Sequence, residues 1–463
     1  MKSNEIKILV AITTIGVILR VIAINQHDFW FDEAFTYHIS KLPLKEFFMA
    51  VVSDNNPPLY YLLIHFLLKV DSSEVTMRLP SLFFSLLTVP FVYQIGKMVK
   101  GKTVGLIAAF LFSVSPLAIY LATEARLHSL GMLLAVASVT IFLKLIKNPS
   151  LKYISLFILV STLGIYAHYY FALLFLPYML IIFTKKYTFL IKKWFFICGF
   201  IFLSFTPWLI LSSLASHNAC SCPNTILSLP AALISPAIGG VGIVTIRSFL
   251  NLPYYLTITM FLAGFSLLLF FIKGLKTNAY ISTIYLLPLT TLALTGFFLP
   301  TFSPKAIAIF SPLYFLLVAL GIYKTNSKVI AMLISLIALV SFIQIINPFF
   351  KGEKLKAAYE VVKKDNQPIL HTSLLTYYTF AYYAQEKRQQ MLITHNPLSK
   401  TTVQYIGGQK EPATYVSSLW LVDSSTWVDK TEYEEILRQL YKHYSVKKNY
   451  VIDSLSINYL KRR

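Results

Sequence analysis

Acidic side chains are scarce in this chain and are missing from its longest apolar part. The sequence has 20 Asp and Glu against 41 Lys and Arg, and none of the acids lies between Ala125 and Gly352. A carboxylate in an apolar region is costly, so it is kept where it has a partner or a task. We therefore expect the early acids to share a place: Glu5, Asp28, Asp32, Glu33, Glu46, Asp54, Asp71, Glu74 and Glu124.

Cysteine is also rare, and common soluble-enzyme motifs are missing. Cys198 lies in an apolar run, whereas Cys220 and Cys222 lie in a more polar stretch. A Cys-x-Cys bridge would close a tight loop, so an oxidised pair is open but not implied. The sequence has no phosphate-cradling glycine loop, Rossmann fingerprint or Ser-His-Asp order, and no internal repeat. None of the cysteines indicates a nucleophile.

Long hydrophobic runs dominate what is present. Of the 463 residues, 56% are hydrophobic and 13% are charged, and the mean hydropathy is +0.64. Repeated apolar runs near bilayer length identify an integral membrane protein. The net charge of +21 would suggest nucleic acid in a soluble protein, but most of the basic residues lie in short clusters between apolar runs, where they set orientation. We therefore predict no nucleic-acid partner.

The positive-inside rule predicts an order of about eleven transmembrane helices. The basic clusters, taken as cytoplasmic, lie around Lys100, Lys147, Lys186, Lys276 and Lys324. The expected spans cover residues 6–24, 78–98, 103–122, 127–146, 152–168, 170–184, 194–213, 254–272, 279–299, 305–323 and 328–347. We interpret the first run as an uncleaved helix with a cytoplasmic N-terminus, although a signal peptide is the alternative reading.

Two other regions complete the predicted organisation. Residues 25–77 form a large outer loop with amphipathic, interfacial segments at Ile39–Val52 and Leu59–Val70. After residue 350 charges of both signs return, and residues 351–463 predict a soluble extracytoplasmic α/β domain. Within it, strands are expected at Ala413–Val422 and His443–Ile452, and a helix at Lys430–Lys442. The transmembrane part is expected to span residues 1–350.

Five motifs occur in an order and spacing that resemble a known family. They are FWFDEAF, NNPPLYYLLIHF from Asn55, RLPSLFFSLLTVPFVYQIGK from Arg78, SPLAIYLATEARLHSL from Ser115 and AHYYFALL from Ala167. Together they are similar to the GT-C membrane glycosyltransferases of the protein-mannosyltransferase and aminoarabinose-transferase type. The resemblance implies inverting transfer of a sugar from a polyprenyl-phosphate carrier, dolichyl or undecaprenyl, to a protein, lipid or glycan acceptor on the outer membrane face.

The resemblance assigns the first-loop aspartate, Asp32, as general base or acceptor-orienting carboxylate. A carboxylate within hydrogen-bond reach takes the proton of a sugar hydroxyl as the new bond forms. Glu33 is placed with Asp32 in the catalytic set, but if the segment is extended it faces the other way, toward a loop arginine or lysine. Glu124 joins the catalytic set as an outer-face acid, and pairing with Arg126 is its structural alternative.

Cations are needed because the leaving group is a phosphate. The candidates that we place in substrate binding are Arg78, Arg126 and Lys305, and Arg247 is a further outer-face cation. Headgroup snorkelling is the alternative for each of them.

Aromatic and imidazole side chains complete the candidate binding set. It includes His128, His168 and Tyr169, with aromatic packing and interfacial anchoring as the alternatives. Asp32, Glu124 and the two histidines have metal-ligand chemistry, but their spacing specifies no geometry, so a divalent metal stays open.

Three alternatives to this function were weighed. An oligosaccharide ligase with a lipid-diphosphate donor would share the architecture and differ in the donor alone. A polytopic lipid or sugar transporter usually carries its ionisable groups near the midplane of the spans, which differs from the loop positions here. A noncatalytic scaffold would explain the helices but not the clustering of the acids.

Overall fold

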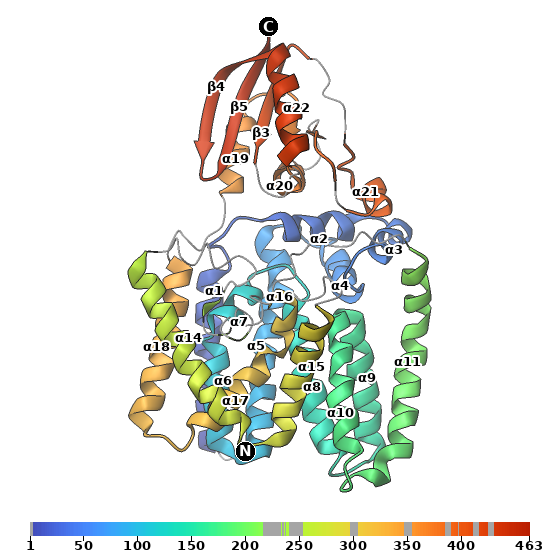
Figure 1. Ribbon diagram of the computed structural model, residues 1–463, viewed down its shortest axis with the longest axis vertical. Helices are drawn as coiled ribbons and strands as arrows, with labels where there is room; N and C mark the ends of the chain where they lie inside the picture. Colours follow the sequence, from blue (N-terminus) through green and yellow to red (C-terminus); the bar gives the residue numbers. More distant parts are fainter. Residues whose placement is uncertain are drawn as a thin grey trace.

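The chain is a helical bundle with a small α/β domain above one end (Figure 1). The computed structural model describes residues 3–215, 233, 236, 238–239, 253–296, 304–346, 354–384, 390–396, 398–410, 416–424 and 430–463. The N-terminus lies at the far end of the bundle and the C-terminus at the tip of the α/β domain. Cys220, Cys222 and Arg247 lie outside the described residues.

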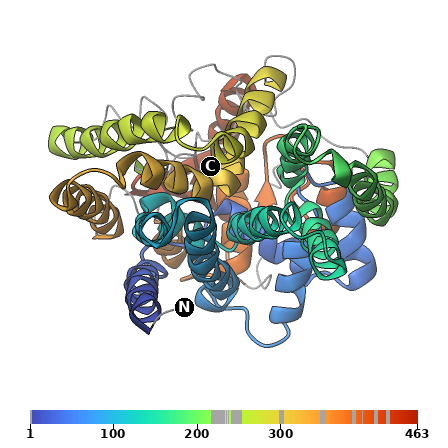
Figure 2. The same cartoon turned by 90° about the horizontal axis from the view of Figure 1, so that it is seen from below.

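Within the described residues, six helices are long and apolar enough to cross a membrane. These are α1 (Ser3–Ala23), α5 (Glu74–Lys100), α8 (His128–Leu145), α11 (Ile191–Leu214), α14 (Tyr254–Leu275) and α18 (Ser327–Ile346). Seen from below, α1 and α11 lie at opposite margins of the bundle (Figure 2). Exposed large hydrophobic side chains on these two helices, such as Val10 and Leu203, suit contact with lipid.

Shorter helical segments fill the rest of the bundle. They are α9 (Leu151–Ala167), the 3-10 turn η1 (Tyr169–Leu174) with α10 (Phe175–Ile182), η2 (Thr188–Leu190), α15 (Ala279–Thr295), and α16 (Pro304–Ile307) with η3 (Ala308–Phe310) and α17 (Ser311–Ile322). Each of the eleven predicted spans overlaps one helix or up to three consecutive helical segments. The fold prediction of a polytopic helical protein is confirmed, but the count of eleven spans stays a prediction.

One continuous helix was predicted over residues 103–122, and that prediction was wrong. The structure has two helices, α6 (Lys102–Ser113) and α7 (Pro116–Ala122), bent by 57° at the break. Ser115 caps α7, its hydroxyl accepting from the backbone N–H of Ala118, and Pro116 occupies the first turn. Proline has no N–H to donate to the preceding turn, so it starts a new helix instead of continuing α6.

The predicted outer loop forms three short helices between the bundle and the α/β domain: α2 (Phe31–Lys41), α3 (Leu44–Val52) and α4 (Leu59–Leu67). The amphipathic segment predicted over Ile39–Val52 is divided, because Leu42 is extended and Pro43 is the N-cap of the next helix. The helix predicted over Leu59–Val70 ends at Leu67. All three helices have buried faces, so they form part of the packed core.

The C-terminal domain contains a five-stranded sheet in the order β2-β1-β3-β5-β4. Strands β1 (Ile369–His371), β2 (Gln390–Leu392) and β3 (Ser418–Asp423) are parallel, whereas β4 (Tyr444–Ile452) and β5 (Leu455–Arg462) form an antiparallel hairpin joined to β3. The helices are α19 (Leu355–Val362), α20 (Leu374–Ala384), α21 (Lys400–Ile406) and α22 (Lys430–His443). The prediction of an α/β domain is confirmed; a boundary at residue 350 stays a prediction.

Helix α20 joins this domain to the bundle by packing on α2. The Tyr378 carbonyl lies 3.0 Å from His38 Nε2, and the hydroxyl of Tyr383 accepts from the backbone N–H of Phe29 at 3.1 Å. Phe29 also stacks on Tyr382, with ring centroids 4.3 Å apart. The C-terminal domain is therefore docked directly on the helix that carries Asp32 and Glu33.

Candidate functional site

Helix α2 places the two neighbouring acids at its start. Asp32 and Glu33 lie in the first turn, after the extended residue Trp30. A carboxylate there is stabilised by the unpaired N–H groups and the positive end of the helix dipole. The segment is helical, so the divergence argued for an extended segment does not apply as such. Successive helical residues still diverge by about 100°, so the two side chains enter different surroundings.

Glu33 forms a buried ion pair with Arg78. Arg78 donates from Nε to Oε1 and from Nη2 to Oε2, both at 2.7 Å, and both side chains are fully buried. Glu33 Oε1 also accepts from the backbone N–H of Ala125 at 2.9 Å. Burial alone would raise the pKa of Glu33, but Arg78 outweighs it and lowers that pKa. Both carboxylate oxygens are therefore occupied, in a bidentate geometry that fixes α2 against α5.

The guanidinium of Arg78 is likewise held by contacts inside the protein. Besides Glu33, its Nη1 donates to the carbonyl of Ile24 at 2.8 Å and to that of His27 at 3.2 Å. We predicted Arg78 as a substrate cation, but the structure directs its guanidinium into the protein. A donor phosphate could reach it only by breaking these contacts.

Lys305 joins the other two predicted catalytic acids. Its Nζ lies 3.0 Å from Oδ2 of Asp32 and 2.9 Å from Oε2 of Glu124, and 4.3 Å from the centre of the Trp30 ring. Helix α16 therefore brings its lysine to α2 and to the turn after α7, which are far apart in the sequence. The partner of Glu124 is Lys305, whereas the sequence alternative was Arg126.

Arg126 lies on the other side of Asp32. Its Nε is 3.9 Å from Asp32 Oδ2, and its Nη1 donates to the hydroxyls of Thr36 and Tyr61 at 3.3 and 3.4 Å. The buried Nε has no hydrogen-bond partner within the described chain. Asp32 is 22% exposed, whereas Glu124 is fully buried. The accessible carboxylate of the cluster is therefore Asp32, flanked by two cations.

The two acids that share Lys305 differ in acidity. Burial opposes ionisation of Asp32, but Arg126 and Lys305 outweigh it, so the pKa of Asp32 lies below its ordinary value. Burial dominates at Glu124 and raises its pKa despite Lys305. Asp32 is therefore ionised over the neutral range. A pair of carboxylates with pKa values shifted in opposite directions is suited to different tasks.

The predicted histidines lie beside each other. His128 begins α8, two residues after Arg126, and its ring centre is 5.8 Å from that of His168. His168 Nδ1 accepts from the backbone N–H of Tyr170 at 3.2 Å, whereas the buried Nδ1 of His128 has no partner in the described chain. Tyr169 is directed to α11, where its hydroxyl accepts from Trp208 Nε1 at 2.9 Å. Tyr169 is therefore held in helix packing.

Several side chains around the cluster were missed from the sequence. Trp30 and Tyr120 face Lys305, at 4.3 and 5.9 Å from Nζ to their ring centres. Tyr61 donates to Asp54 Oδ2 at 2.7 Å, which links the NNPPLYYLL motif to Arg126. The sequence signal was present, because Trp30 and Tyr61 fall within the recognised motifs. An aromatic side chain within a motif does not by itself indicate a charged partner, so neither was selected.

A metal site is not assembled from the residues that the structure describes. No group of three or more His, Cys, Asp or Glu side chains among them is placed to hold an ion. Lys305 instead occupies the position between the two carboxylates Asp32 and Glu124. The described arrangement is therefore a cluster in which Asp32 is flanked by the cations Lys305 and Arg126.

Comparison with known proteins agrees with this architecture. Residues 55–211 match the family described as dolichyl-phosphate-mannose-protein mannosyltransferase. ArnT from Cupriavidus metallidurans shares the fold in its apo structure (TM-score 0.64) and in its structure bound to undecaprenyl phosphate (TM-score 0.61), each at 10% identity over 99% of this chain and 98% of that chain. No curated protein sequence matches the chain.

A more distant similarity is to the Archaeoglobus fulgidus oligosaccharyltransferase tethered with an acceptor peptide. The TM-score is 0.49 at 12% identity, over 100% of this chain and 74% of that chain. The ArnT structures show the shared fold, and the family match over residues 55–211 confirms the predicted resemblance to GT-C membrane glycosyltransferases, which are enzymes. The individual roles of the site residues stay predictions.

Proposed function

We propose that this protein transfers a sugar from a polyprenyl-phosphate carrier to an acceptor hydroxyl at the outer membrane face, with inversion. The observation that carries the proposal is the position of Asp32, an accessible carboxylate between Lys305 and Arg126. ArnT, which shares the fold, has been crystallised with undecaprenyl phosphate. A base next to two cations is the combination that attack by a hydroxyl and departure of a phosphate require.

In the proposed reaction, Asp32 accepts the proton of the acceptor hydroxyl. The hydroxyl oxygen then bonds to the anomeric carbon from the side opposite the phosphate, which leaves with the electrons of its C–O bond. The products are the glycoside and the polyprenyl phosphate, and Asp32 returns its proton to solvent. Its lowered pKa keeps it ionised before each cycle.

The cations would receive the leaving group. Arg126 Nε is buried without a hydrogen-bond partner in the described chain, 3.9 Å from Asp32. A phosphate oxygen that enters the cluster would satisfy this unused donor. Lys305 would move from Asp32 toward the phosphate while Glu124 holds it from behind at 2.9 Å. Displacement of Lys305 would also release Asp32 for proton transfer, so donor binding and base activation are linked.

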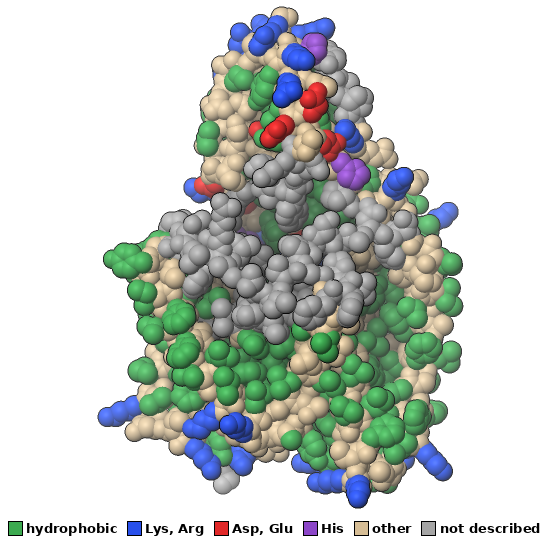
Figure 3. Space-filling view, viewed as in Figure 1, with side chains coloured by type: hydrophobic (Ala, Val, Ile, Leu, Met, Phe, Trp, Pro, Cys, Tyr) green, Lys and Arg blue, Asp and Glu red, His purple; other side chains and the backbone are tan. Residues whose placement is uncertain are grey.

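The proposed orientation places this cluster and the C-terminal domain outside the cell membrane and the N-terminus in the cytoplasm. Lys and Arg side chains gather at the end of the bundle far from the C-terminal domain (Figure 3). The helix ends at Lys100, Lys144 and Lys273 carry such residues. By the positive-inside rule this end is cytoplasmic.

A ligase that uses a lipid diphosphate is the second candidate. Two cations at one carboxylate, Lys305 and Arg126, suit the larger charge of a diphosphate as well as that of a monophosphate. Transport is less consistent with the structure, because the cluster lies at helix ends and connecting turns. An ion-coupling site is expected near the midplane.

Native mass spectrometry of the purified protein tests the donor class. The proposal expects co-purified polyprenyl phosphate, or its monosaccharide ester, in wild-type protein and reduced occupancy in Arg126→Met. Glu46→Gln, a change at an exposed acid of α3, is the control and should retain the lipid. A lipid diphosphate carrying an oligosaccharide would replace the proposal with the ligase. A protein that retains neither lipid, and binds neither added decaprenyl phosphate nor added decaprenyl diphosphate, would overturn both.

A further inference from the structure

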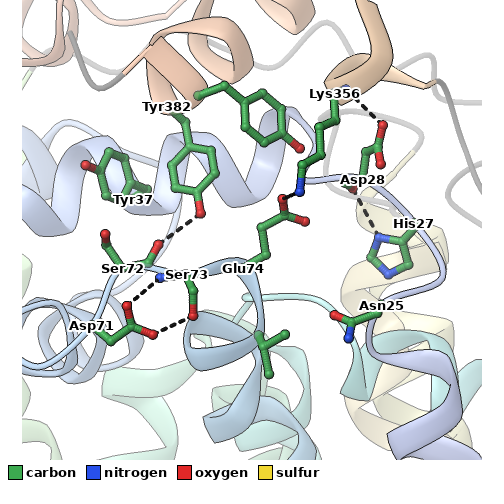
Figure 4. A pocket seen from close by; sticks show the side chains of 12 residues that line it. Asn25, His27, Asp28, Tyr37, Asp71, Ser72, Ser73, Glu74, Lys356 and Tyr382 are labelled. Atoms are coloured by element: carbon green, nitrogen blue, oxygen red, sulfur yellow. Dashed lines mark hydrogen bonds and ion pairs between the residues drawn. The ribbon is translucent and has the colours of Figure 1, made fainter. Parts of the chain in front are cut away.

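A cavity of about 650 Å³ opens between the C-terminal domain and the start of α5, apart from the Asp32 cluster (Figure 4). Its wall comes from the connection between α1 and α2, from Tyr37 of α2, from the segment 71–75, and from α19 and α20. Parts of the chain that are far apart in sequence thus form one open chamber. Neither the proposed base nor the proposed phosphate cations line it, so its ligand must be considered separately.

Charge limits what this cavity can bind. Its lining contains three acids, Asp28, Asp71 and Glu74, and one lysine, Lys356. Lys356 is already engaged, since its Nζ lies 3.2 Å from Glu74 Oε1 and its backbone N–H donates to Asp28 at 2.9 Å. Burial lowers the pKa of His27, which also lines the cavity, so this histidine is neutral near pH 7. The excess of carboxylates disfavours a phosphate or another anion.

The remaining lining is polar and aromatic. Tyr37, Tyr382 and Tyr383 contribute rings and hydroxyls, together with Ser72 and Ser73. The hydroxyl of Tyr382 donates to the backbone carbonyl of Ser72 at 2.9 Å (Figure 4). Val75 is the one aliphatic side chain in the lining. A lipid chain would find little apolar surface there. Aromatic faces together with carboxylates, hydroxyls and an amide match the CH faces and hydroxyl edges of a sugar.

The buried Glu33–Arg78 pair connects the cavity to the catalytic helix. Arg78 Nη2 donates to the backbone carbonyl of Asp28 at 3.3 Å, and Nη1 lies 3.9 Å from Glu74, while its other contacts hold Glu33. Arg78 therefore links the cavity wall to Glu33, the residue next to Asp32. A ligand in the cavity is positioned relative to α2 without touching the proposed base.

From this geometry we propose that the cavity is a carbohydrate-binding site for neutral or amino-bearing sugars. Resting on the proposed function, the bound sugar is part of the acceptor, and the cavity holds it while another portion of the acceptor reaches Asp32. The donor phosphate and the acceptor are then separated by charge: the phosphate goes to Lys305 and Arg126, and the acceptor glycan goes to the acidic cavity.

The test measures binding and does not depend on turnover. Full-length protein in nanodiscs is titrated calorimetrically with chitotriose, with its de-acetylated trimer and with trilysine. Asn25 lines the cavity and is exposed, so Asn25→Trp fills the opening without entering the core. Val70→Trp is the matched control, because Val70 is 83% exposed, next to Asp71, and outside the lining.

We expect wild type and Val70→Trp to bind at least one of the two oligosaccharides equally well, and Asn25→Trp to bind it at least tenfold more weakly. Tyr37→Phe, which removes one lining hydroxyl, should weaken it severalfold. Binding of trilysine alone would assign the cavity to a basic peptide and overturn the proposal. So would an unchanged affinity in Asn25→Trp, or no oligosaccharide binding by wild type.

Failure of the proposed function gives a different pattern. If the protein neither binds nor cleaves a polyprenyl-phosphate sugar yet loses oligosaccharide affinity in Asn25→Trp, the cavity assignment stands without its acceptor role. If transfer occurs, Asn25→Trp should raise the KM for acceptor at least tenfold and leave the KM for donor unchanged. Transfer with unchanged KM for acceptor contradicts the acceptor assignment.

Discussion

Two neighbouring carboxylates, Asp32 and Glu33, differ in what surrounds them. Glu33 is fully buried and bidentate to Arg78, whereas Asp32 is partly exposed between Lys305 and Arg126. A buried ion pair that loses one partner leaves an uncompensated charge. An exposed carboxylate can be neutralised with less damage. Substitution of Glu33 should therefore reduce mainly stability, whereas substitution of Asp32 should reduce mainly activity.

Glu33→Gln is expected to destabilise the protein by about 3–5 kcal/mol, the usual cost of removing one partner of a buried pair. Asp32→Asn should lose much less stability and still lose transfer. Thermal unfolding in detergent, monitored for both variants and wild type, measures the difference. Equal losses of stability would show that Asp32 is as structural as Glu33, which would remove the basis for the assignment.

The pKa values of Asp32 and Glu124 predict that kcat/KM falls in two steps as the pH decreases. The pKa of Glu124 is raised by burial and that of Asp32 is lowered by its cations, so falling pH protonates Glu124 first. Protonation of Glu124 loosens the hold on Lys305 before the base itself is lost. In Glu124→Gln that first step is absent.

The pH profile of kcat/KM checks this order. The wild-type profile should fall at a pH above the ordinary range of an aspartate, and the acid limb of Glu124→Gln should move to lower pH, since Asp32 alone then titrates. The variant should also have a lower plateau, because Lys305 loses a fixed partner. An acid limb at the same pH in both proteins would mean that Glu124 does not control it.

At the scale of elements, the break between α6 and α7 is held by a buried arginine. Arg20 is fully buried, and it donates to the carbonyl of Ser113 at 2.9 Å, to that of Gly16 at 3.1 Å and to the hydroxyl of Ser85 at 3.0 Å. Ser113 ends α6, where carbonyls lack helical partners and attract a cation. The bend directs α7 toward the turn that carries Glu124.

Arg20→Met is therefore expected to destabilise the protein by about 1–3 kcal/mol, because the Ser113 carbonyl loses a charged donor. Ser85→Ala removes one weaker contact of the same guanidinium and should cost less. Thermal unfolding of both variants gives the comparison. If Arg20→Met were no less stable than Ser85→Ala, the guanidinium would not be holding the break.

Helical elements were predicted better than short or interrupted ones. Long apolar runs such as α14 and α18 give an unambiguous signal, and helix α22 and strand β4 matched within a residue. Strands β1 and β2 were missed because each has three residues, too few to show an alternating pattern. The break before α7 depends on Ser115 and Pro116, which a hydropathy window averages away.

For the candidate site, the residues could be selected from the sequence, but their pairing could not. Asp32, Glu124 and Arg126 were selected from the motifs and Lys305 as an outer-face cation, and the structure brings the four together. Pairing was not predictable in the same way: Lys305 is 181 residues from Glu124 in sequence, and only the fold decides that it, instead of Arg126, is the partner. Arg78 was selected for its charge, but its burial against Glu33 requires the packing of α2 on α5.

At the scale of the whole molecule, the prediction concerns the orientation of the protein in the membrane. The Lys-rich helix ends and the C-terminal domain lie at opposite ends of the structure (Figures 1 and 3). In a variant with Cys198, Cys220 and Cys222 replaced by serine, Ser454→Cys should react with a membrane-impermeant maleimide on intact cells. Lys186→Cys, at the basic end, should react only after the cells are opened. The reverse labelling would place the proposed site in the cytoplasm.

The central claim is that Asp32 activates an acceptor for attack on a polyprenyl-phosphate sugar. The most direct measurement is transfer by reconstituted protein from a panel of synthetic decaprenyl-phosphate monosaccharides to acceptors in native membrane extract, with wild type, Asp32→Asn and Glu46→Gln in parallel. We expect transfer from at least one donor by wild type and Glu46→Gln, and a loss of at least 100-fold in Asp32→Asn, the lower end of the contribution of a general base. Full activity of a folded, membrane-inserted Asp32→Asn protein would contradict the account.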